Sequence, residues 1–459
     1  MERFAAHINR MGEIDGASAL EPGLAKALAR AGLAAPEGLR RLTGGATMES
    51  WFFSSGAEDF VLRRAPSLSF MEGRPFGHEV EAAIINAAHD AGVMAPEVVV
   101  GLEPADGIGS GFVMRALPGT AEPRVILDMK QPGRLLEEVA RDLARIHAIP
   151  RAALPEDVPE LDYAEAVNGL VQQFEDAGGD RPIIALGLKW LRDHLPEPLE
   201  PVLNHGDFRL GNLLAEESHL TGVLDWELCH FGDRHEDLAF GCMAVWRFSR
   251  IDRPALGLGS LKDYLVAYEQ ESGFGVDPDR FRFWLIYRTV WWALGCLRMA
   301  SFWRSGDDRM LERVVISRRT SEQELDLLLL LEEDAPEEER ARPVPTIEKR
   351  PEPQGEASMG EIASAISEWL ATIKDRMDGH DRFQFAVARN ALSMLARGDQ
   401  IVGGCENRHL AQQLLRGECS LRNPGVLAAL RRGALDKLAA DVPKYPMLER
   451  ARAKWTGEN

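Results

Sequence analysis

The chain has 459 residues, of which 45% are hydrophobic, and its formal net charge at pH 7 is -19. This length exceeds one ordinary hydrophobic core, so we expect two or three domains, and the hydrophobic content excludes a wholly disordered chain. The negative charge argues against a broad surface for nucleic acid or anionic membrane, because such partners are bound through basic patches. We therefore expect no nucleic-acid partner.

The cysteine pattern and the apolar runs of the sequence indicate in which cellular compartment the protein is expected. The five cysteines are an odd number without CxxC spacing, and the start of the chain lacks the continuous apolar core of a signal peptide. Arginines interrupt the most apolar run, Phe281 to Trp303, which we interpret as a buried helix and not a membrane span. The sequence therefore predicts a reduced, cytoplasmic protein without a membrane span.

The first predicted elements are a helix and a glycine-rich hairpin. Apolar residues at helical spacing predict a short helix from Pro22 to Gly32. Next, Gly44 and Gly45 separate two strand-like runs. A glycine-rich hairpin lets backbone N–H groups approach phosphates closely, which a Cβ would hinder. A plain β-turn fits the same residues, so both interpretations stay open.

More strands and one helix follow in the first 117 residues. Phe60 to Arg64 reads as a strand that ends in cations, and strands are also expected at Pro96 to Val100 and Gly111 to Leu117. Between them, Phe76 to Gly92 has helical periodicity, with Gly92 as the stop. This part of the chain is therefore predicted to form a small lobe of strands with a helix.

Helices dominate the rest of the chain. Periodicity predicts them at 135–147, 161–194, 232–239, 261–271, 281–303, 310–331, 362–373, 383–397 and 425–440. Glu332 to Ala357 is rich in proline and acidic residues, which is typical of a solvated linker. We predict four parts: an N-terminal helix with a small lobe (1–117), a helical lobe (118–331), the linker (332–357) and an all-α C-terminal domain (358–459).

One stretch carries the chemistry. An apolar strand at Val202 leads into a polar loop with Asp207 and Asn212. Leu213–Leu214 and Gly222–Leu224 then read as two short strands around a polar turn. Antiparallel pairing about that turn brings Asn212 and Asp225 to the same open end, so three oxygen-bearing side chains are predicted to converge.

Phosphoryl transfer needs such a set of oxygens. A carboxylate takes or orients the proton of the acceptor hydroxyl, and hard oxygen ligands hold Mg²⁺ on the nucleotide phosphates. In this interpretation Asp207 is catalytic, and Asn212 and Asp225 are the metal ligands. The alternative is that Asp207 and Asn212 merely cap turns, where both residue types are common.

The order His205-Gly206-Asp207, Asn212 and later Asp225 resembles the aminoglycoside phosphotransferase and choline kinase-like family. Leu62-Arg63-Arg64 resembles the branch of that family fused to acyl-CoA dehydrogenases. The resemblance spans about residues 39–331. It implies an α+β, bilobal, protein-kinase-like fold, with a small β-rich N-lobe and a mainly helical C-lobe, and it implies ATP and Mg²⁺ as cofactors.

The resemblance also assigns nucleotide-binding roles. Gly44 and Gly45 would approach the phosphates, and Met114 would lie in the hinge segment beside the adenine. Arg63 stands where protein-kinase-type members place a phosphate-gripping Lys, a departure that Arg can accommodate by bidentate contact; a solvated edge-strand arginine is the alternative. Glu81 corresponds to the helix glutamate that pairs with this cation, and Glu79 is an open alternative.

The predicted function is ATP- and Mg²⁺-dependent phosphorylation of the hydroxyl of a small molecule. Aromatic and arginine side chains after Asp225 favour an anionic, partly apolar acceptor, such as a hydroxyacyl thioester of coenzyme A. The alternative is that the aromatic residues belong to the core and the arginines to the surface. The residues are Trp246, Arg247, Phe248, Arg250, Trp291, Trp292, Arg298, Trp303 and Arg304. The alternatives are an aminoglycoside or macrolide resistance kinase and a catalytically inactive nucleotide-binding scaffold. The C-terminal helical domain is predicted to serve oligomerisation or partner docking.

Overall fold

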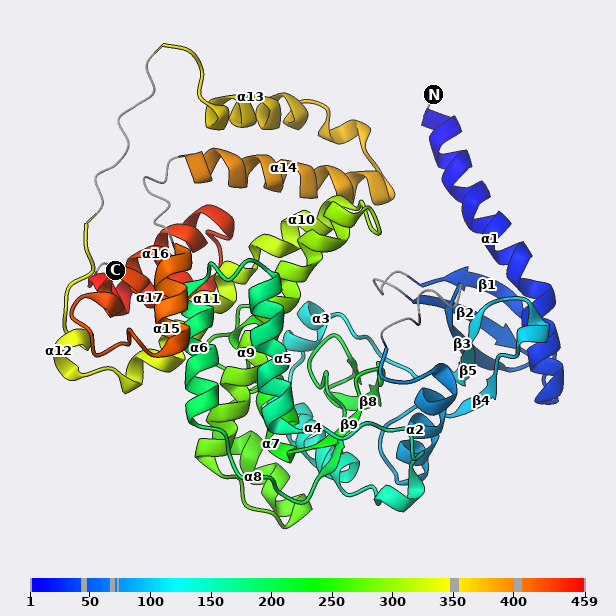
Figure 1. Cartoon of the computed structure of the whole chain (residues 1–459). Coiled ribbons are helices and arrows are strands. Elements are labelled where there is room, and N and C mark those ends of the chain that lie inside the picture. The colour runs from blue at the N-terminus through cyan, green and yellow to red at the C-terminus, as the bar shows by residue number, and fades with distance from the viewer. Residues whose placement is uncertain are drawn as a thin grey trace. The chain divides into compact units, whose positions relative to one another are not determined.

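The computed structural model of the chain describes residues 2–42, 48–66, 71, 74–346, 355–399 and 407–457 (Figure 1). It divides into two compact units. The first consists of Met1–Leu161, Pro198–Cys242 and Asp252–Asp277, and the second consists of Asp162–Glu197, Met243–Ile251 and Pro278–Asn459. The predicted limits after residues 117, 331 and 357 do not coincide with the limits of these units, and the division into four parts stays a prediction.

The first unit contains the strands and the helices that support them. Its strands are β1 (Glu37–Arg41), β2 (Glu49–Ser55), β3 (Glu58–Ala65), β4 (Val98–Gly101), β5 (Ser110–Arg115), β6 (Val202–Asn204), β7 (Leu213–Glu216), β8 (His219–Val223) and β9 (His230–Gly232). Its helices are α1 (Glu2–Arg30), α2 (His78–Asp90), α3 (Pro123–Leu127), α4 (Pro132–His147), α7 (Arg234–Phe240) and α8 (Leu261–Ser272), with short 3-10 turns at Pro104–Asp106 and Arg151–Ala153.

Five strands form an antiparallel sheet in the order β1-β2-β3-β5-β4. Buried and partly exposed residues alternate along β2, as expected for a sheet with one face in the core. Leu20, Leu24 and Leu28 of α1 pack in one cluster with apolar residues of that sheet, among them Phe53 and Phe60. Helix α1 begins at Glu2, well before the predicted start at Pro22, and its apolar row on the sheet extends past that proline to Leu20.

The two-stranded sheets of this unit carry the polar loops. β6 pairs with β9, and β7 pairs with β8 as an antiparallel hairpin in which Leu213 lies opposite Val223. Glu217 and Ser218 form the turn with positive φ angles of 49° and 69°. The predicted hairpin is confirmed.

The second unit is helical in the part that the structure describes. Its helices are α5 (Tyr163–Asp176), α6 (Pro182–Asp193), α9 (Pro278–Ser305), α10 (Leu311–Arg318), α11 (Thr320–Leu331), α12 (Glu337–Arg340), α13 (Met359–Ala371), α14 (Gly379–Asp399), α15 (Asn407–Arg416), α16 (Val426–Asp441) and α17 (Pro446–Thr456), with 3-10 turns at Ala244–Arg247, Glu332–Asp334 and Lys374–Arg376. The predicted helix at 310–331 is two helices that meet at Arg319. Among the described helices, none is long and apolar enough to cross a membrane.

Helices α16 and α17 share their core with α11. Arg431 of α16 donates to the carboxylate of Glu332 through Nε at 2.9 Å and Nη2 at 2.6 Å, and Trp455 of α17 donates to the same carboxylate at 2.8 Å. In addition, the hydroxyl of Tyr445 donates to buried Asp326 of α11 at 2.5 Å. The last helices are thus tied to the helical lobe by buried polar contacts.

These contacts correct the prediction for the start of the linker. Glu332 and Glu339 are buried, with 1% and 4% of their surface exposed, and both lie in short helical turns instead of an extended solvated chain. Glu339 accepts from the backbone N–H of Gly425 at 2.8 Å. Glu337 and Glu338 of the same stretch are exposed, as the prediction requires, whereas Glu332 and Glu339 meet partners that lie far along the sequence. Residues 347–354 of the predicted linker are outside the described residues.

Candidate active site

The open end of the β7–β8 hairpin places Asn212 beside Asp225. The backbone N–H of Leu224 donates to the carbonyl oxygen of Asn212 at 2.8 Å, which extends the ladder by one pair beyond the strands. Asp225 then turns into the left-handed region with φ of 70°, a conformation that costs energy for a residue with a Cβ. This local strain at the end of a hairpin directs the chain after β8 into the loop that carries Glu227.

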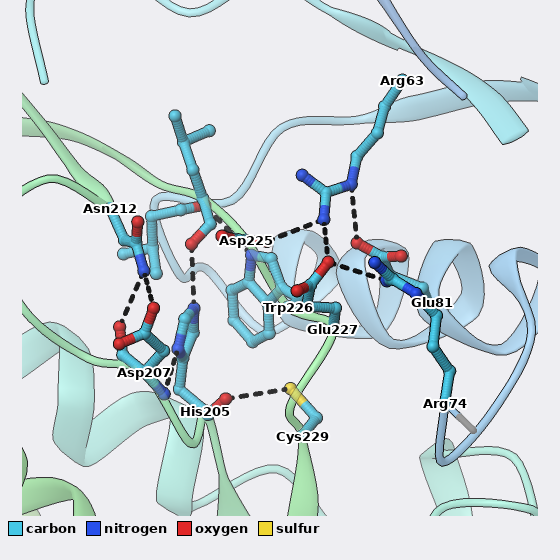
Figure 2. Close-up of polar contacts among 12 residues, drawn as sticks. Arg63, Arg74, Glu81, His205, Asp207, Asn212, Asp225, Trp226, Glu227 and Cys229 are labelled. Carbon is cyan, nitrogen blue, oxygen red and sulfur yellow. Dashed lines mark hydrogen bonds and ion pairs between the residues drawn. The ribbon is translucent and has the colours of Figure 1, made fainter. Parts of the chain in front are cut away.

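The loop after β6 holds Asp207 between an amide and a guanidinium. Asn212 donates through Nδ2 to the carboxylate of Asp207 at 2.6 Å and to its backbone carbonyl at 3.0 Å (Figure 2). Arg209 donates to the same carboxylate through Nε at 2.8 Å and Nη2 at 3.1 Å. Burial raises the pKa of Asp207 to about 6, although Arg209 and Asn212 act in the opposite direction. Asp207 is thus a stronger base than an ordinary aspartate, and its orientation is fixed.

A buried network of hydrogen bonds around Asp237 holds the backbone of this loop. Asp237 accepts from the backbone N–H groups of His205 at 2.6 Å and Gly206 at 2.9 Å. Burial works against its charge, but the hydrogen bond from His147 and these N–H groups lower the pKa of Asp237 to about 2. Gly206 has φ of +81°, and a Cβ there would lie 2.3 Å from the carbonyl oxygen of Leu228, so only glycine fits.

His205 serves the same support. Its Nε2 contacts the carbonyl oxygen of Leu224 at 3.1 Å, and its Nδ1 contacts the backbone N–H of Asp207 at 3.2 Å. Nε2 therefore carries the proton and Nδ1 accepts, which describes the neutral imidazole. Burial also lowers the pKa of His205. The ring links the loop of Asp207 to the segment that precedes Asp225.

Arg63 of β3 connects the sheet to that segment. Its Nε lies 3.2 Å from Oε1 of Glu81 on α2, and its Nη2 donates to Asp225 at 2.7 Å and to Glu227 at 2.6 Å (Figure 2). The partner on α2 is therefore Glu81. The carboxylate of Glu79 instead folds back over the N-terminus of α2, within 2.4 Å of the place where a Cβ on Gly77 would lie.

Three carboxyl groups and two guanidinium groups gather around Arg63. Arg74 adds a second cation and donates to Glu227 at 2.7 Å, so two guanidinium groups face the carboxylates of Glu81, Asp225 and Glu227. Burial raises the pKa of Glu81 to about 7, with Asp225 and Glu227 acting in the same direction and Arg63 against it. With Glu81 partly protonated at neutral pH, the two guanidinium groups of the cluster chiefly balance the carboxylates of Asp225 and Glu227.

Of the other residues predicted to contact the nucleotide, the structure describes Met114 and not the two glycines. Met114 lies on β5, opposite Val61 of β3 and Val98 of β4. Gly44 and Gly45 lie outside the described residues. Sequence reasoning missed Arg74, Arg209 and Glu227. Two of these had a local signal, since Arg209 lies two residues after Asp207 and Glu227 two residues after Asp225.

The predicted acceptor residues belong to the second unit and differ in exposure. Trp246 is 8% exposed and packs against Trp292 with ring centroids 5.3 Å apart, so it is a core residue. Trp303 is 37% exposed, with the guanidinium of Arg309 over its ring. The remaining residues of the set are half-buried or exposed, so its members do not share one environment.

The antiparallel sheet with helix α2, followed by the Asp207–Asn212 loop, the hairpin and Asp225, is arranged as a protein-kinase-like fold. The chain belongs to the phosphotransferase enzyme family, whose model matches residues 38–284, more than half of the chain. The resemblance seen in the sequence is therefore confirmed.

Individual relatives match parts of the chain. Mouse acyl-CoA dehydrogenase family member 10 is 28% identical over 274 residues, which cover 55% of this chain and 25% of that protein. An Escherichia coli aminoglycoside 3′-phosphotransferase is 31% identical over 144 residues, which cover 29% of this chain and 52% of that enzyme. The chain thus spans between a quarter and about half of the length of these relatives.

A solved structure is similar in fold. A candidate aminoglycoside phosphotransferase from Ralstonia eutropha JMP134 superimposes with a TM-score of 0.54 at 20% identity, covering 65% of this chain and 93% of that one. This likeness confirms the predicted α+β, bilobal, kinase-like fold with additional C-terminal helices.

Proposed function

We propose that the protein transfers the γ-phosphoryl group of ATP, in the presence of Mg²⁺, to a hydroxyl group of a small molecule. The observation that carries the proposal is the fixed pair Asp207–Asn212, held at 2.6 Å, beside a hairpin that ends in Asp225. A turn-capping role would not require a buried carboxylate with a raised pKa, and it would not require the network of Asp237 beneath it. Membership of the phosphotransferase family supports the same chemistry.

The donor set around Asp225 fits Mg²⁺. The amide nitrogen of Asn212 contacts Asp207, so its carbonyl oxygen is turned away from that residue (Figure 2). An amide oxygen and a carboxylate are hard ligands, and Mg²⁺ is commonly held by one or two protein side chains together with nucleotide phosphates. Asn212 and Asp225 would hold the ion, which would neutralise charge on the transferred phosphoryl group.

Arg63 is proposed to bind the nucleotide phosphates. Its ion pair with Glu81 fixes the guanidinium at the end of β3, and its remaining contacts are the carboxylates of Asp225 and Glu227. A planar guanidinium can hold two phosphate oxygens at once. Bound phosphates would therefore replace carboxylates as its partners and leave Asp225 to the metal.

Asp207 is proposed to orient the acceptor hydroxyl and to take its proton. The hydroxyl oxygen bonds to the γ-phosphorus as the bond to the bridging oxygen of ADP breaks, and the proton goes to the carboxylate. The hydrogen bonds from Asn212 and Arg209 hold this carboxylate in one orientation, which matters because positioning contributes much of the catalysis in phosphoryl transfer.

The acceptor class can be tested directly. The identity shared with an acyl-CoA dehydrogenase family member favours an anionic hydroxyacyl-CoA, whereas the identity shared with an aminoglycoside 3′-phosphotransferase favours an antibiotic. We favour the hydroxyacyl-CoA. In an assay of ADP release with Mg²⁺ and ATP, hydroxyacyl-CoA substrates are expected to be turned over and kanamycin-like aminoglycosides or macrolides to react slowly.

The other outcomes of this assay discriminate between the alternatives. Efficient antibiotic turnover without activity on acyl-CoAs would contradict the proposed acceptor and would leave the phosphotransferase proposal intact. Nucleotide binding by calorimetry together with no phosphorylation across a broad metabolite panel would support the inactive scaffold and contradict both.

The contact between Arg209 and Asp207 predicts a pH effect. Activity is expected to fall as the pH drops through about 6, because Asp207 accepts a proton only when it is ionised. Arg209→Ala removes a cation that favours the ionised carboxylate, so the pKa of Asp207 should rise and the acid limb of kcat/KM should move to higher pH. Arg209→Lys should restore part of the shift, and Arg141→Ala, at an exposed site on α4, is the control. An acid limb that stays in place in Arg209→Ala would contradict this role.

A further inference from the structure

Helix α13 carries a row of large apolar side chains that are open to water. Met359, Ile362, Ile366 and Trp369 are 75%, 44%, 43% and 62% exposed. They are spaced alternately three and four residues apart, so they lie on one face of the helix, as the a and d positions of a coiled coil do. We call these four residues the α13 stripe.

The side of α13 that packs within the chain is built from small residues instead. Gly360, Ala363 and Ser367 are its buried positions, and α13 lies beside α14 (Figure 1). A Cβ on Gly360 would lie 2.8 Å from the Cβ of Asp399, so the two helices approach closely there. A surface helix normally turns its large apolar residues toward its own core. In α13 the small residues serve that contact, and the large ones face outward.

We infer that the α13 stripe is a contact surface for a second copy of this chain, in which two α13 helices pack antiparallel about a two-fold axis near Ile366. A two-fold interface requires a surface that is complementary to itself. The stripe fits such packing, because together with the partly buried Ile373 just after the helix it has Ile366 at its midpoint, and antiparallel packing sets each three-residue step of one copy against a four-residue step of the other. Alternating three- and four-residue steps are also the pattern by which helices interdigitate at about 20°.

The charges around the stripe favour the antiparallel arrangement. Glu361 and Glu368 are exposed on the helix, and the 3-10 turn that follows contains Lys374, Asp375 and Arg376, with a net positive charge. Antiparallel packing about Ile366 brings the basic turn of one copy toward the N-terminal end of α13 in the other, where Glu361 lies, whereas parallel packing would set like charges side by side. The helix dipoles also oppose each other favourably in the antiparallel pair.

The exposed apolar area of the stripe comes close to the area that a specific dimer needs. Taking roughly 200 Å² for each full side chain, the exposed fractions of the stripe amount to about 450 Å² per copy. Two copies would bury roughly 900 Å² of apolar surface before the polar rim is counted, and specific interfaces start at about 1,000 Å² in total. A patch of this kind on one helix is a recognised mark of an interaction surface.

The experiment is to measure the oligomeric state of the full chain by sedimentation velocity at micromolar concentration. The wild-type chain is expected at about twice the monomer mass of 50.8 kDa. Ile366→Glu places two like charges at the axis and should give the monomer mass. Val266→Glu, at a site on α8 that is 39% exposed in the first unit, is the matched control and should leave the dimer intact.

Crosslinking gives an independent readout. Because Ile366 faces its own counterpart at the axis, Ile366→Cys should be joined chain to chain by a short bis-maleimide, while Val266→Cys should not. A wild-type monomer would overturn the inference. Maleimide labelling of Ile366→Cys would then tell why: a thiol that reacts freely lies on an open face, and a thiol that resists lies on a face covered by the same chain. A dimer that survives Ile366→Glu would equally overturn it, because the contact would then lie elsewhere.

Discussion

Replacing Asp207 by asparagine is expected to lower kcat by roughly 10²- to 10⁴-fold, the usual contribution of a general base. Asparagine keeps the size of the side chain and can still accept through its one amide oxygen, but its NH2 group cannot accept from Arg209 or Asn212, and the side chain cannot take the proton of the acceptor hydroxyl. Nucleotide affinity should change little, because the proposed phosphate and metal contacts are Arg63, Asn212 and Asp225. The measurement is steady-state ADP release with the acceptor that the wild type uses fastest, together with ATP binding by calorimetry.

The control for this experiment is Asp252→Asn, since the side chain of Asp252 is 76% exposed. Its kcat should equal that of the wild type. A wild-type kcat in Asp207→Asn would remove Asp207 from the mechanism. A fall in ATP affinity that matches the fall in kcat would instead show that Asp207 acts in nucleotide binding.

The second large effect is expected on stability, from the buried pair between α16 and the end of α11. Arg431 and Glu332 have side chains that are 4% and 1% exposed, with closest atoms 2.6 Å apart. Arg431→Met removes the main partner of a buried carboxylate, and breaking such a pair typically costs about 3–5 kcal/mol. Trp455 and Lys454 continue to contact Glu332, which should keep the loss near the lower value. The free energy of unfolding is measured by urea titration.

Arg134→Met is the matched control, because Arg134 and Glu138 form an exposed pair one helical turn apart on α4. Such a pair contributes about 0.3–0.5 kcal/mol. If Arg431→Met were as stable as this control, the C-terminal helices would not depend on the buried pair. That result would favour the predicted C-terminal domain (358–459) as a part that folds without this pair.

Local patterns along the sequence are sufficient to predict the loop that carries Asp207 and the hairpin that follows it. Asp207 and Asn212 are five residues apart, and the strands that carry Asn212 to Asp225 are joined by a short turn. Contacts of such small separation depend on turn chemistry and strand pattern alone, so they can be read from the residues. The periodicity of Ile362, Ile366 and Trp369 likewise predicted a helix correctly, but helical spacing does not tell whether a face is buried.

The tertiary structure decided which distant groups meet. Glu79 and Glu81 both lie in the first turn of α2, and only the position of β3 selects Glu81 as the partner of Arg63. The acidic run at Glu332 looked solvated, yet its partner Arg431 lies 99 residues further on and is brought to it by helix packing.

By itself, then, the sequence determined most helices and strands and the order Asp207, Asn212, Asp225, because these depend on local spacing, and the resemblance of its motifs implied the fold family. The structure alone decided the ion pairs of Arg63, the contact of Arg209 with Asp207 and the exposure of the α13 stripe. The physical reason is that a charge or an apolar face has no fixed environment until packing brings in residues from elsewhere in the chain, and that environment sets its pKa, its partner and its exposure.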